Sequence, residues 1–266
     1  MSGWDHAATA ERYERFCRTH ARYRRANEVL VGEADLASGH SVLDFGAGTG
    51  RTASAALRRL GPRGAVVCVE PAAAMRAAGE RRLRDRRVAW REALPDARDA
   101  GARFDRVLAG AVIWQLEPLD EWIARLAALL RPGGALAFNV PALYLGEPDE
   151  PGAGRDPLLL DLVARLAADA VPVGRVATAP PRAPLRRSTI NEALTSAGLA
   201  FRAWEFRYRL TQTVFARWLA IPVLTDTLFA GAAPGERERR IERALGEVDQ
   251  RSFKWERWRG WTAWKP

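Results

Sequence analysis

The sequence contains few of the side chains that usually build covalent or metal sites. It has two cysteines, three histidines and two methionines among 266 residues. Cys68 stands inside a predicted strand, so we expect Cys17 and Cys68 to be reduced residues and not a disulfide or a metal pair. The sequence therefore predicts a protein without a metal site.

Long apolar runs are also missing, and no stretch approaches the length of a transmembrane helix. The first residues include Asp5, Glu11 and Glu14 and lack the apolar core of a secretory signal. We therefore expect a cytoplasmic protein with no membrane partner. With 48% hydrophobic residues, the chain can bury a full core as one α/β domain with additions, spanning residues 1–266.

Lysine is nearly absent, so the net charge of +9 comes from arginine. A basic chain suggests a nucleic-acid partner, because clustered cations displace counterions from phosphate. The arginines here are spread along the whole length. Their densest group is equally typical of a solvated helix face and comprises Arg15, Arg18, Arg22, Arg24 and Arg25. We expect a small-molecule substrate, with nucleic acid as an alternative.

A glycine-rich turn follows the first predicted strand, Ser41 to Phe45, and precedes a predicted helix from Arg51. A turn that brings its backbone against a ligand at the end of a strand needs residues without a Cβ. The free amides at the start of the next helix favour a polar, partly anionic ligand. The glycines of this turn are Gly46, Gly48 and Gly50.

Asp44 distinguishes two kinds of nucleotide ligand for this turn. The dinucleotide fingerprint has the spacing G-x-G-x-x-G and holds a pyrophosphate. Here the spacing is G-x-G-x-G, and Asp44 precedes the first glycine by two residues. Its carboxylate would repel pyrophosphate but accepts a hydrogen bond from an ammonium group. The predicted ligand is an amino acid joined to a nucleoside.

The stretch 44–50, D-F-G-A-G-T-G, resembles the first motif of the class I S-adenosylmethionine-dependent methyltransferases, small-molecule (type 11-like) group. Residues 65–70 form an apolar run closed by Glu70, an acid suited to ribose hydroxyls. Residues 104–111 are similar to the family's fourth strand, and 130–138 resemble its L-x-P-G-G turn into the fifth. The resemblance covers Val42 to about Val140 well and the rest loosely.

This resemblance implies an α/β fold: a Rossmann-like, seven-stranded, mostly parallel sheet with a C-terminal antiparallel strand and helices on both faces. It also implies an N-terminal helical cap and an inserted lid region. The expected parts are a cap at 1–37, a cofactor-binding core at 41–140, substrate-side loops and lid helices at 141–198 and 209–250, and closing strands at 199–208 and 258–265. The implied cofactor is S-adenosyl-L-methionine, with S-adenosyl-L-homocysteine as its product.

The resemblance also implies a set of cofactor-binding residues: Asp44, Gly46, Ala47, Gly48, Gly50, Glu70, Pro71, Met75, Glu92, Ala93, Ala109 and Trp114. Met75 either packs against adenine or is an ordinary core methionine. Glu92 and Ala93 stand where relatives place an aspartate and an amide on the adenine ring, so this loop departs from the family. Trp114 is either an aromatic wall near the methyl group or a core tryptophan under the helix at 120–130.

Candidate catalytic residues are Tyr13, His20 and Tyr144. Tyr13 ends an A-x-x-Y element that, in the family's cap, lies near the active site; the alternative is a packed helix tyrosine. His6 and His20 are possible general bases, although a single histidine on a helix is more often surface or core. Tyr144 lies in a predicted loop at 141–157 that is expected to cover the pocket.

No dominant base is evident, which favours O-methylation of an acidic hydroxyl of a small molecule by positioning. The acceptor would be a phenol, an enol or a carboxyl, in secondary metabolism. The fourth strand lacks the D/N-P-P-Y element that relatives use on base nitrogens, yet the charge keeps an RNA-directed enzyme open. A third alternative is a cofactor-binding protein of this fold that transfers no methyl group. A monomer or homodimer is expected.

Overall fold

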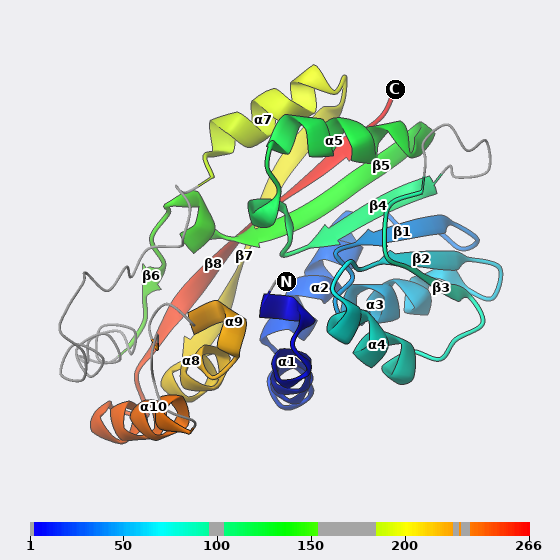
Figure 1. Cartoon of the computed structure of the whole chain (residues 1–266). Helices are drawn as coiled ribbons and strands as arrows, with labels where there is room; N and C mark the ends of the chain where they lie inside the picture. Colours follow the sequence, from blue (N-terminus) through cyan, green and yellow to red (C-terminus); the bar gives the residue numbers. More distant parts are fainter. Residues whose placement is uncertain (1–2, 96–103, 154–184, 226–228, 230–234) are drawn as a thin grey trace.

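The computed structural model describes residues 3–95, 104–153, 185–225, 229 and 235–266. Its strands form one sheet in the order β3-β2-β1-β4-β5-β8-β6, with β7 also paired to β8 (Figure 1). The strand bounds are β1 Ser41–Phe45, β2 Ala65–Val69, β3 Val88–Arg91, β4 Phe104–Gly110, β5 Leu130–Pro141, β6 Glu150–Pro151, β7 Ala200–Thr211 and β8 Phe253–Trp264.

Strands β1 to β5 pair in parallel, and β8 runs antiparallel to both β5 and β7. The expected mostly parallel sheet with an antiparallel C-terminal strand is confirmed. The described residues hold an eight-stranded sheet, where seven strands were expected, because the two-residue β6 also pairs with β8. The closing strands are longer than expected, since β7 and β8 stay paired as far as Thr211 and Phe253.

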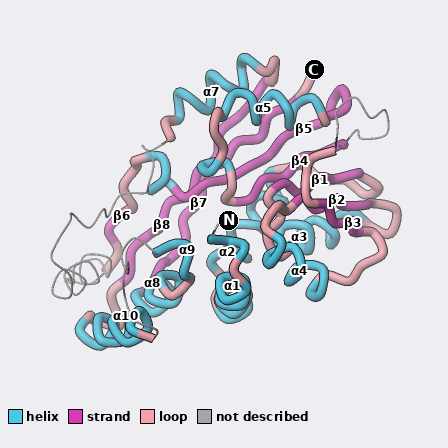
Figure 2. The backbone as a smooth tube through the Cα atoms, in the orientation of Figure 1, coloured by secondary structure: helices cyan, strands magenta, loops and turns pink. Residues whose placement is uncertain are grey.

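Helices cover both faces of the sheet. Figure 2 shows α5 and α7 above the strands and α2 and α3 below them. The bounds are η1 Gly3–Asp5, α1 Ala7–Thr19, α2 Arg22–Glu33, α3 Arg51–Leu60, α4 Ala73–Arg82, η2 Ile113–Gln115, α5 Leu119–Ala128, η3 Ala142–Leu145, α7 Arg187–Ser196, α8 Gln212–Leu219, α9 Pro222–Thr225 and α10 Glu236–Glu247. Part of the expected lid region, residues 154–184, 226–228 and 230–234, lies outside the described residues.

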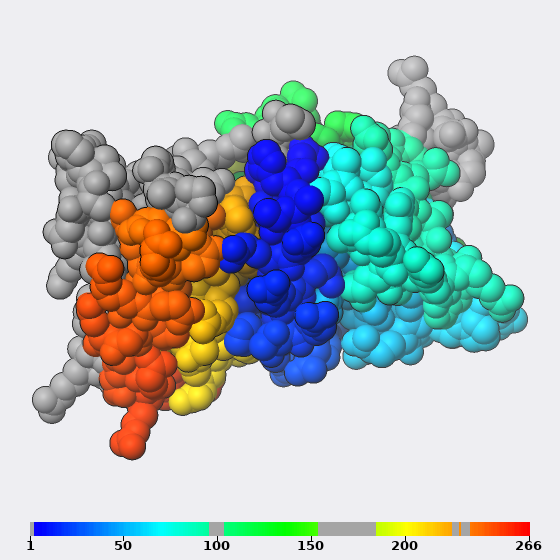
Figure 3. Space-filling view, turned by 60° about the horizontal axis from the view of Figure 1, so that its bottom comes forward, coloured from blue at the N-terminus to red at the C-terminus, as the bar shows by residue number. Residues whose placement is uncertain are grey.

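Three apolar clusters hold these layers together. One lies between the sheet and α5 and α7, around Phe138 and Ile123. A second lies under the sheet against α2 and α3, around Leu30 and Leu60. The third joins α1 to α8 and α10 and includes Phe16. In Figure 3 the N-terminal segment, in blue, fills the space between α8 and α10 on one side and α3 and α4 on the other.

Candidate cofactor and substrate site

A cavity of about 460 Å³ lies where β1, β4 and β5 end. Its wall includes Gly46 after β1, Gly110 at the end of β4 and Pro141 at the end of β5. Trp4 and Asp5 of η1 also line the cavity, and η1 lies near the centre of Figure 1. In an open α/β sheet, ligands bind at this carboxyl edge of the parallel strands. The cavity is therefore the candidate site of the chain.

The glycine turn has the backbone geometry that only glycine adopts without strain. The φ angles of Gly46, Gly48 and Gly50 are +64°, +55° and +75°. A Cβ on Gly46 would lie 2.6 Å from Val112 Cγ2. Gly46 and Gly48 line the cavity. Ala47 and Gly50 do not, and their amides close the turn by donating to Val69 O at 3.0 Å and Ala47 O at 2.7 Å.

Asp44 lies beneath this turn and is fully buried. Its Oδ2 accepts the amide hydrogen of Ala53 at 2.9 Å, which ties β1 to the first turn of α3. Its Oδ1 has no hydrogen-bond partner in the described part of the chain. Burial raises the pKa of Asp44 to about 7. Asp44 is not among the residues that line the cavity, and its expected contact with a cationic ligand group remains a prediction.

Glu70 lines the cavity and connects two backbone segments. Its Oε2 accepts the Gly48 amide hydrogen at 2.7 Å, and its Oε1 accepts that of Ala72 at 2.9 Å. Burial raises its pKa. A carboxylate has about four acceptor positions, so both oxygens keep capacity for ligand hydroxyls. The expected contact with ribose remains a prediction.

One end of the cavity is formed by residues that follow β2 and β3. Pro71, Met75, Glu92 and Ala93, all expected as cofactor residues, lie in this part of the wall. Glu92 accepts a hydrogen bond from Arg76 Nη2 at 3.1 Å. Further wall residues, which were not expected from the sequence, come from β1, α5 and the residue after η2: Phe45, Trp122, Arg125 and Leu116.

The N-terminal cap forms the adjoining part of the wall, where Trp4 and Tyr13 pack in one apolar cluster with Met75. Tyr13 lines the cavity, and its ring lies 5.9 Å from the Trp4 ring and 5.4 Å from the Tyr23 ring, measured between centroids. Asp5 also lines the cavity, and its Oδ1 accepts the Ala73 amide hydrogen at 3.0 Å. Trp4, Asp5 and Tyr23 were not expected here, because no local motif marks them.

Glu14 holds the cap on the glycine turn. Its Oε1 accepts hydrogen bonds from the Thr49 hydroxyl and from Arg51 Nε. Its Oε2 accepts a further bond from Arg51 Nη2 at 2.7 Å. One carboxylate on α1 therefore contacts both the turn and the start of α3.

Trp114 and Tyr144 stack face to face in the cavity wall, with ring centroids 4.1 Å apart and an interplanar angle of 3°. Trp114 Nε1 donates to Ala111 O at 2.9 Å. Both rings also pack on the apolar cluster under α5. Trp114 thus takes both positions considered for it, in the wall and against the core. Its distance from a methyl group remains a prediction.

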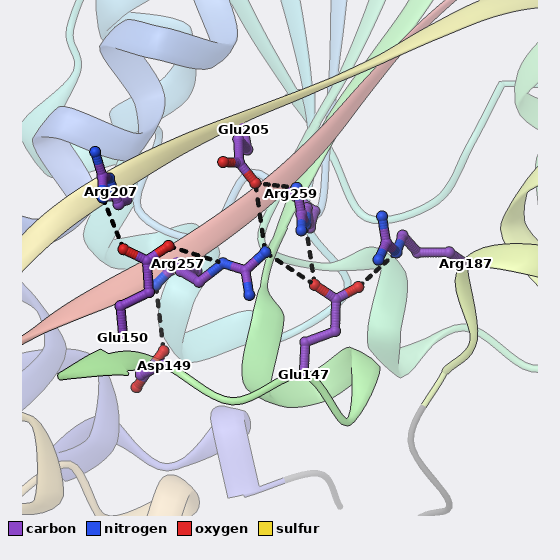
Figure 4. A network of polar contacts seen from close by, with 8 residues as sticks. All are labelled: Glu147, Asp149, Glu150, Arg187, Glu205, Arg207, Arg257 and Arg259. Atoms are coloured by element: carbon purple, nitrogen blue, oxygen red, sulfur yellow. Dashed lines mark hydrogen bonds and ion pairs between the residues drawn. The ribbon is translucent and has the colours of Figure 1, made fainter.

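The segment after Tyr144 is fixed to the sheet by a network of charged side chains (Figure 4). Glu147 accepts a hydrogen bond from Arg259 Nε at 3.0 Å and pairs with Arg187 Nε at 2.6 Å. Glu150 pairs with Arg207 Nη1 at 2.7 Å. These contacts join η3 and β6 to β7, β8 and the start of α7, and so hold Tyr144 in place.

Five of the expected residues are not among those that line the cavity: Asp44, Ala47, Gly50, His20 and Ala109. His20 follows the last turn of α1, with its ring 5.1 Å from the Phe16 ring. Burial, followed by the charge of Arg217, lowers its pKa. Ala109 is fully buried among core residues of β4, and the next residue, Gly110, is the one in the wall. His6 is exposed at the N-cap of α1.

Other expectations concern cysteines, metals and membranes. Cys17 and Cys68 are buried free thiols, as expected. Within the described ranges, no three metal-ligating side chains gather in one place. The same part of the chain contains no helix with the length and apolarity needed to cross a membrane.

Comparison with known proteins places this geometry in a family. Residues 43–136 match a family model described as a methyltransferase domain. A trans-aconitate 2-methyltransferase of Methylobacterium nodulans is 30% identical over 212 residues, which cover 78% of this chain and 73% of that protein. The enzyme of the same name from Deinococcus radiodurans is 31% identical over 133 residues, covering 50% of this chain and only 48% of its own length.

A solved structure supports the fold at lower identity. It is a phosphoethanolamine N-methyltransferase of Haemonchus contortus, in complex with phosphomonomethylethanolamine and S-adenosylhomocysteine. Its TM-score is 0.53 at 17% identity, over 91% of this chain and 52% of that one. The chain therefore belongs to the class I S-adenosylmethionine-dependent methyltransferases, and S-adenosylmethionine is its cofactor.

Proposed function

We propose that this protein methylates a carboxylate oxygen of a small organic acid. The observation that carries the proposal is the 30% identity to a trans-aconitate 2-methyltransferase over most of both chains. Of the acidic hydroxyls expected from the sequence, a carboxyl is therefore favoured over a phenol or an enol. The expected role in secondary metabolism remains a prediction.

The side chains around the cavity suit an acceptor that is already ionised. Burial raises the pKa of both Tyr13 and Tyr144, so these hydroxyls stay protonated near neutral pH. They can donate hydrogen bonds but are poor general bases. No histidine is among the described residues that line the cavity. A carboxylic acid with an ordinary pKa of about 4 needs no base, because it is ionised near neutral pH.

The reaction then needs placement and little else. A carboxylate oxygen of the substrate attacks the methyl carbon in line with the sulfur, a new C–O bond forms, and the C–S bond breaks. The bonding pair stays on sulfur, which changes from a sulfonium to a neutral thioether. The products are a methyl ester and S-adenosylhomocysteine, and no proton is transferred. Aligned, partly desolvated reactants account for the acceleration.

The test is transfer of labelled methyl from S-adenosylmethionine to a panel of organic acids, phenols and RNA. We expect base-labile label, typical of an ester, in the acids only. Tyr13→Phe and Tyr144→Phe variants should keep kcat within about tenfold if the hydroxyls position the substrate without removing a proton. Label in RNA, or tight cofactor binding without turnover on any acceptor, would contradict the proposal.

A further inference from the structure

Arg22 is a buried cation whose guanidinium is only partly satisfied. Arg22 is only 3% exposed to solvent. Nε donates to Glu256 Oε2 at 2.8 Å, and Nη2 donates to Glu256 Oε1. Nη1 has no hydrogen-bond partner among the described residues. An unpartnered buried donor on a charged group is costly, so this nitrogen calls for a functional explanation.

The surrounding side chains hold Arg22 in one place. Its Cζ lies 4.9 Å, 5.0 Å and 5.2 Å from the ring centroids of Tyr23, Trp218 and Trp258. Trp258 Nε1 also donates to Glu256 Oε2 at 2.8 Å. Burial alone would lower the pKa of Arg22, but the neighbouring Glu256 carboxylate raises it. The guanidinium is therefore charged, and its position is fixed by one carboxylate and three rings.

Arg22 lies directly behind one end of the cavity. Tyr23, Tyr144 and Pro141 line this end. Tyr23 stacks near the guanidinium, and Pro141 is the β-ladder partner of Trp258. Burial raises the pKa of Tyr144, and the positive charge of Arg22 opposes that rise, so the hydroxyl is within its electrostatic reach. Of these wall residues, Tyr23 contacts the cation directly, and Pro141 is connected to it through Trp258.

The Tyr23 hydroxyl at this end has a hydrogen-bond arrangement that suits an anion. The Tyr23 oxygen accepts the Trp218 Nε1 hydrogen at 3.0 Å. Its own hydroxyl hydrogen is then available to donate to a ligand. Because a nearby cation strengthens such a donor, an anion gains more here than a neutral group does.

We propose that Tyr23, Tyr144 and Pro141 form a carboxylate-binding subsite, in which the two hydroxyls contact the ligand and Arg22 is a positioning residue behind them. The proposal rests on the proposed function and adds that the substrate carries a second carboxylate. The reacting carboxylate must keep an oxygen lone pair free for attack, so the carboxylate held by donors beside a cation is the one that anchors the molecule. The substrate class is therefore a di- or tricarboxylic acid.

The test measures binding separately from turnover. Butanedioate and its monoamide are titrated into the full chain saturated with S-adenosylhomocysteine, by calorimetry. We expect the wild type to bind the dicarboxylate at least tenfold more tightly than the monoamide. The Arg22→Gln/Glu256→Gln double variant leaves no unpaired charge, and should lose most of that preference while cofactor affinity stays unchanged. With substrates that turn over, KM should rise about 10- to 100-fold and kcat should change little.

Two further variants separate this role from stability. Arg106→Gln is the matched control, because Arg106 is also a buried arginine but its donors are satisfied by the Ala34, Asp35 and Asp105 carbonyls away from the cavity. It should lower the melting temperature without changing the preference. Tyr144→Phe removes one of the two proposed contacts and should weaken dicarboxylate binding severalfold, even if the double variant fails to fold.

Equal binding of the two ligands by the wild type would overturn the subsite, as would a preference that survives in a folded double variant. If the preference depends on Arg22 but no acid is methylated, the subsite stands and the proposed function fails. If acids are methylated and the preference ignores Arg22 and Tyr144, the proposed function stands and the subsite fails.

Discussion

The two ends of the cavity are built from the chain in different ways. The glycine turn and Glu70, at the cofactor end, come from neighbouring stretches of the chain, where the Glu70 carboxylate joins the Gly48 and Ala72 amides. The other end is assembled from distant segments, and its central ion pair joins Arg22 in α2 to Glu256 in β8. A local sequence motif is sufficient to specify the glycine turn and Glu70 at the first end. The second forms only when β8 inserts between β5 and β7.

Because the cofactor end depends on this local motif, we expect the largest effect on cofactor affinity from a substitution in the glycine turn. In Gly46→Ala, the added Cβ would lie 2.6 Å from Val112 Cγ2, at a φ of +64° that L side chains rarely adopt. We expect S-adenosylmethionine affinity to fall at least 100-fold in calorimetry. Gly133→Ala is the control, since Gly133 has a φ of +73° but a Cβ added there would meet nothing within 4 Å. Similar losses in both variants would mean that strain alone, and not the shape of the turn, determines binding.

A second prediction concerns Asp44, whose pKa of about 7 lies above its ordinary value of 3.8. If Asp44 binds the cofactor ammonium, it must be ionised, so affinity should fall about tenfold per pH unit below about 7 and level off above it. Asp44→Asn should bind 10- to 100-fold more weakly at pH 8 and show no such step. Calorimetry between pH 5.5 and 8 measures both. A flat profile in the wild type would exclude this contact.

The same pKa shift has an opposite consequence for stability. The folded apo protein holds the Asp44 proton more tightly than the unfolded chain does. The stabilisation that comes from the protonated Asp44 side chain is therefore fully present below pH 4, and it is lost as the pH rises through about 7. Asp44→Asn should then melt at a higher temperature than the wild type at pH 8, and the difference should shrink as the pH falls toward 4. A variant that is less stable at pH 8 would contradict this.

The sequence predicts the cofactor end of the cavity better than the end around Arg22. Strands β1 and β2, the glycine turn and Glu70 are recognisable because adjacent residues determine both their structure and their contacts. Arg22 appeared only as part of a basic helix face, because its partner Glu256 is 234 positions away and is brought near by the β5–β8–β7 pairing. Trp4 and Asp5 reach the cavity only through the packing of α1 against α4.

Glu14 offers a way to test whether the two ends are coupled, since it joins the cap to the turn through Thr49 and Arg51. In Glu14→Gln the charge is lost but most of the shape remains. We expect cofactor affinity and substrate KM to worsen together, by about three- to tenfold, because the pair with Arg51 is only partly exposed. Glu11→Gln, an exposed change on the same helix, is the control. A change in only one of the two constants would mean that the cap does not couple them.

The smallest effect is expected at the charged network that fixes the segment after Tyr144. Glu147 pairs with Arg259, Arg187 and Arg257, so Glu147→Gln weakens three contacts at once. The pair with the half-exposed Arg187 contributes at most about 1 kcal/mol and is screened by salt, whereas the pair with Arg259 is mostly buried and is screened less. Substrate KM should therefore rise about two- to fivefold in low salt and less in high salt, with cofactor affinity unchanged. Glu242→Gln removes a comparable pair between α10 and Arg217 in α8 and should leave KM unaltered. If the two variants behave alike, the network stabilises the fold without positioning Tyr144, and the substrate end depends on its buried residues alone.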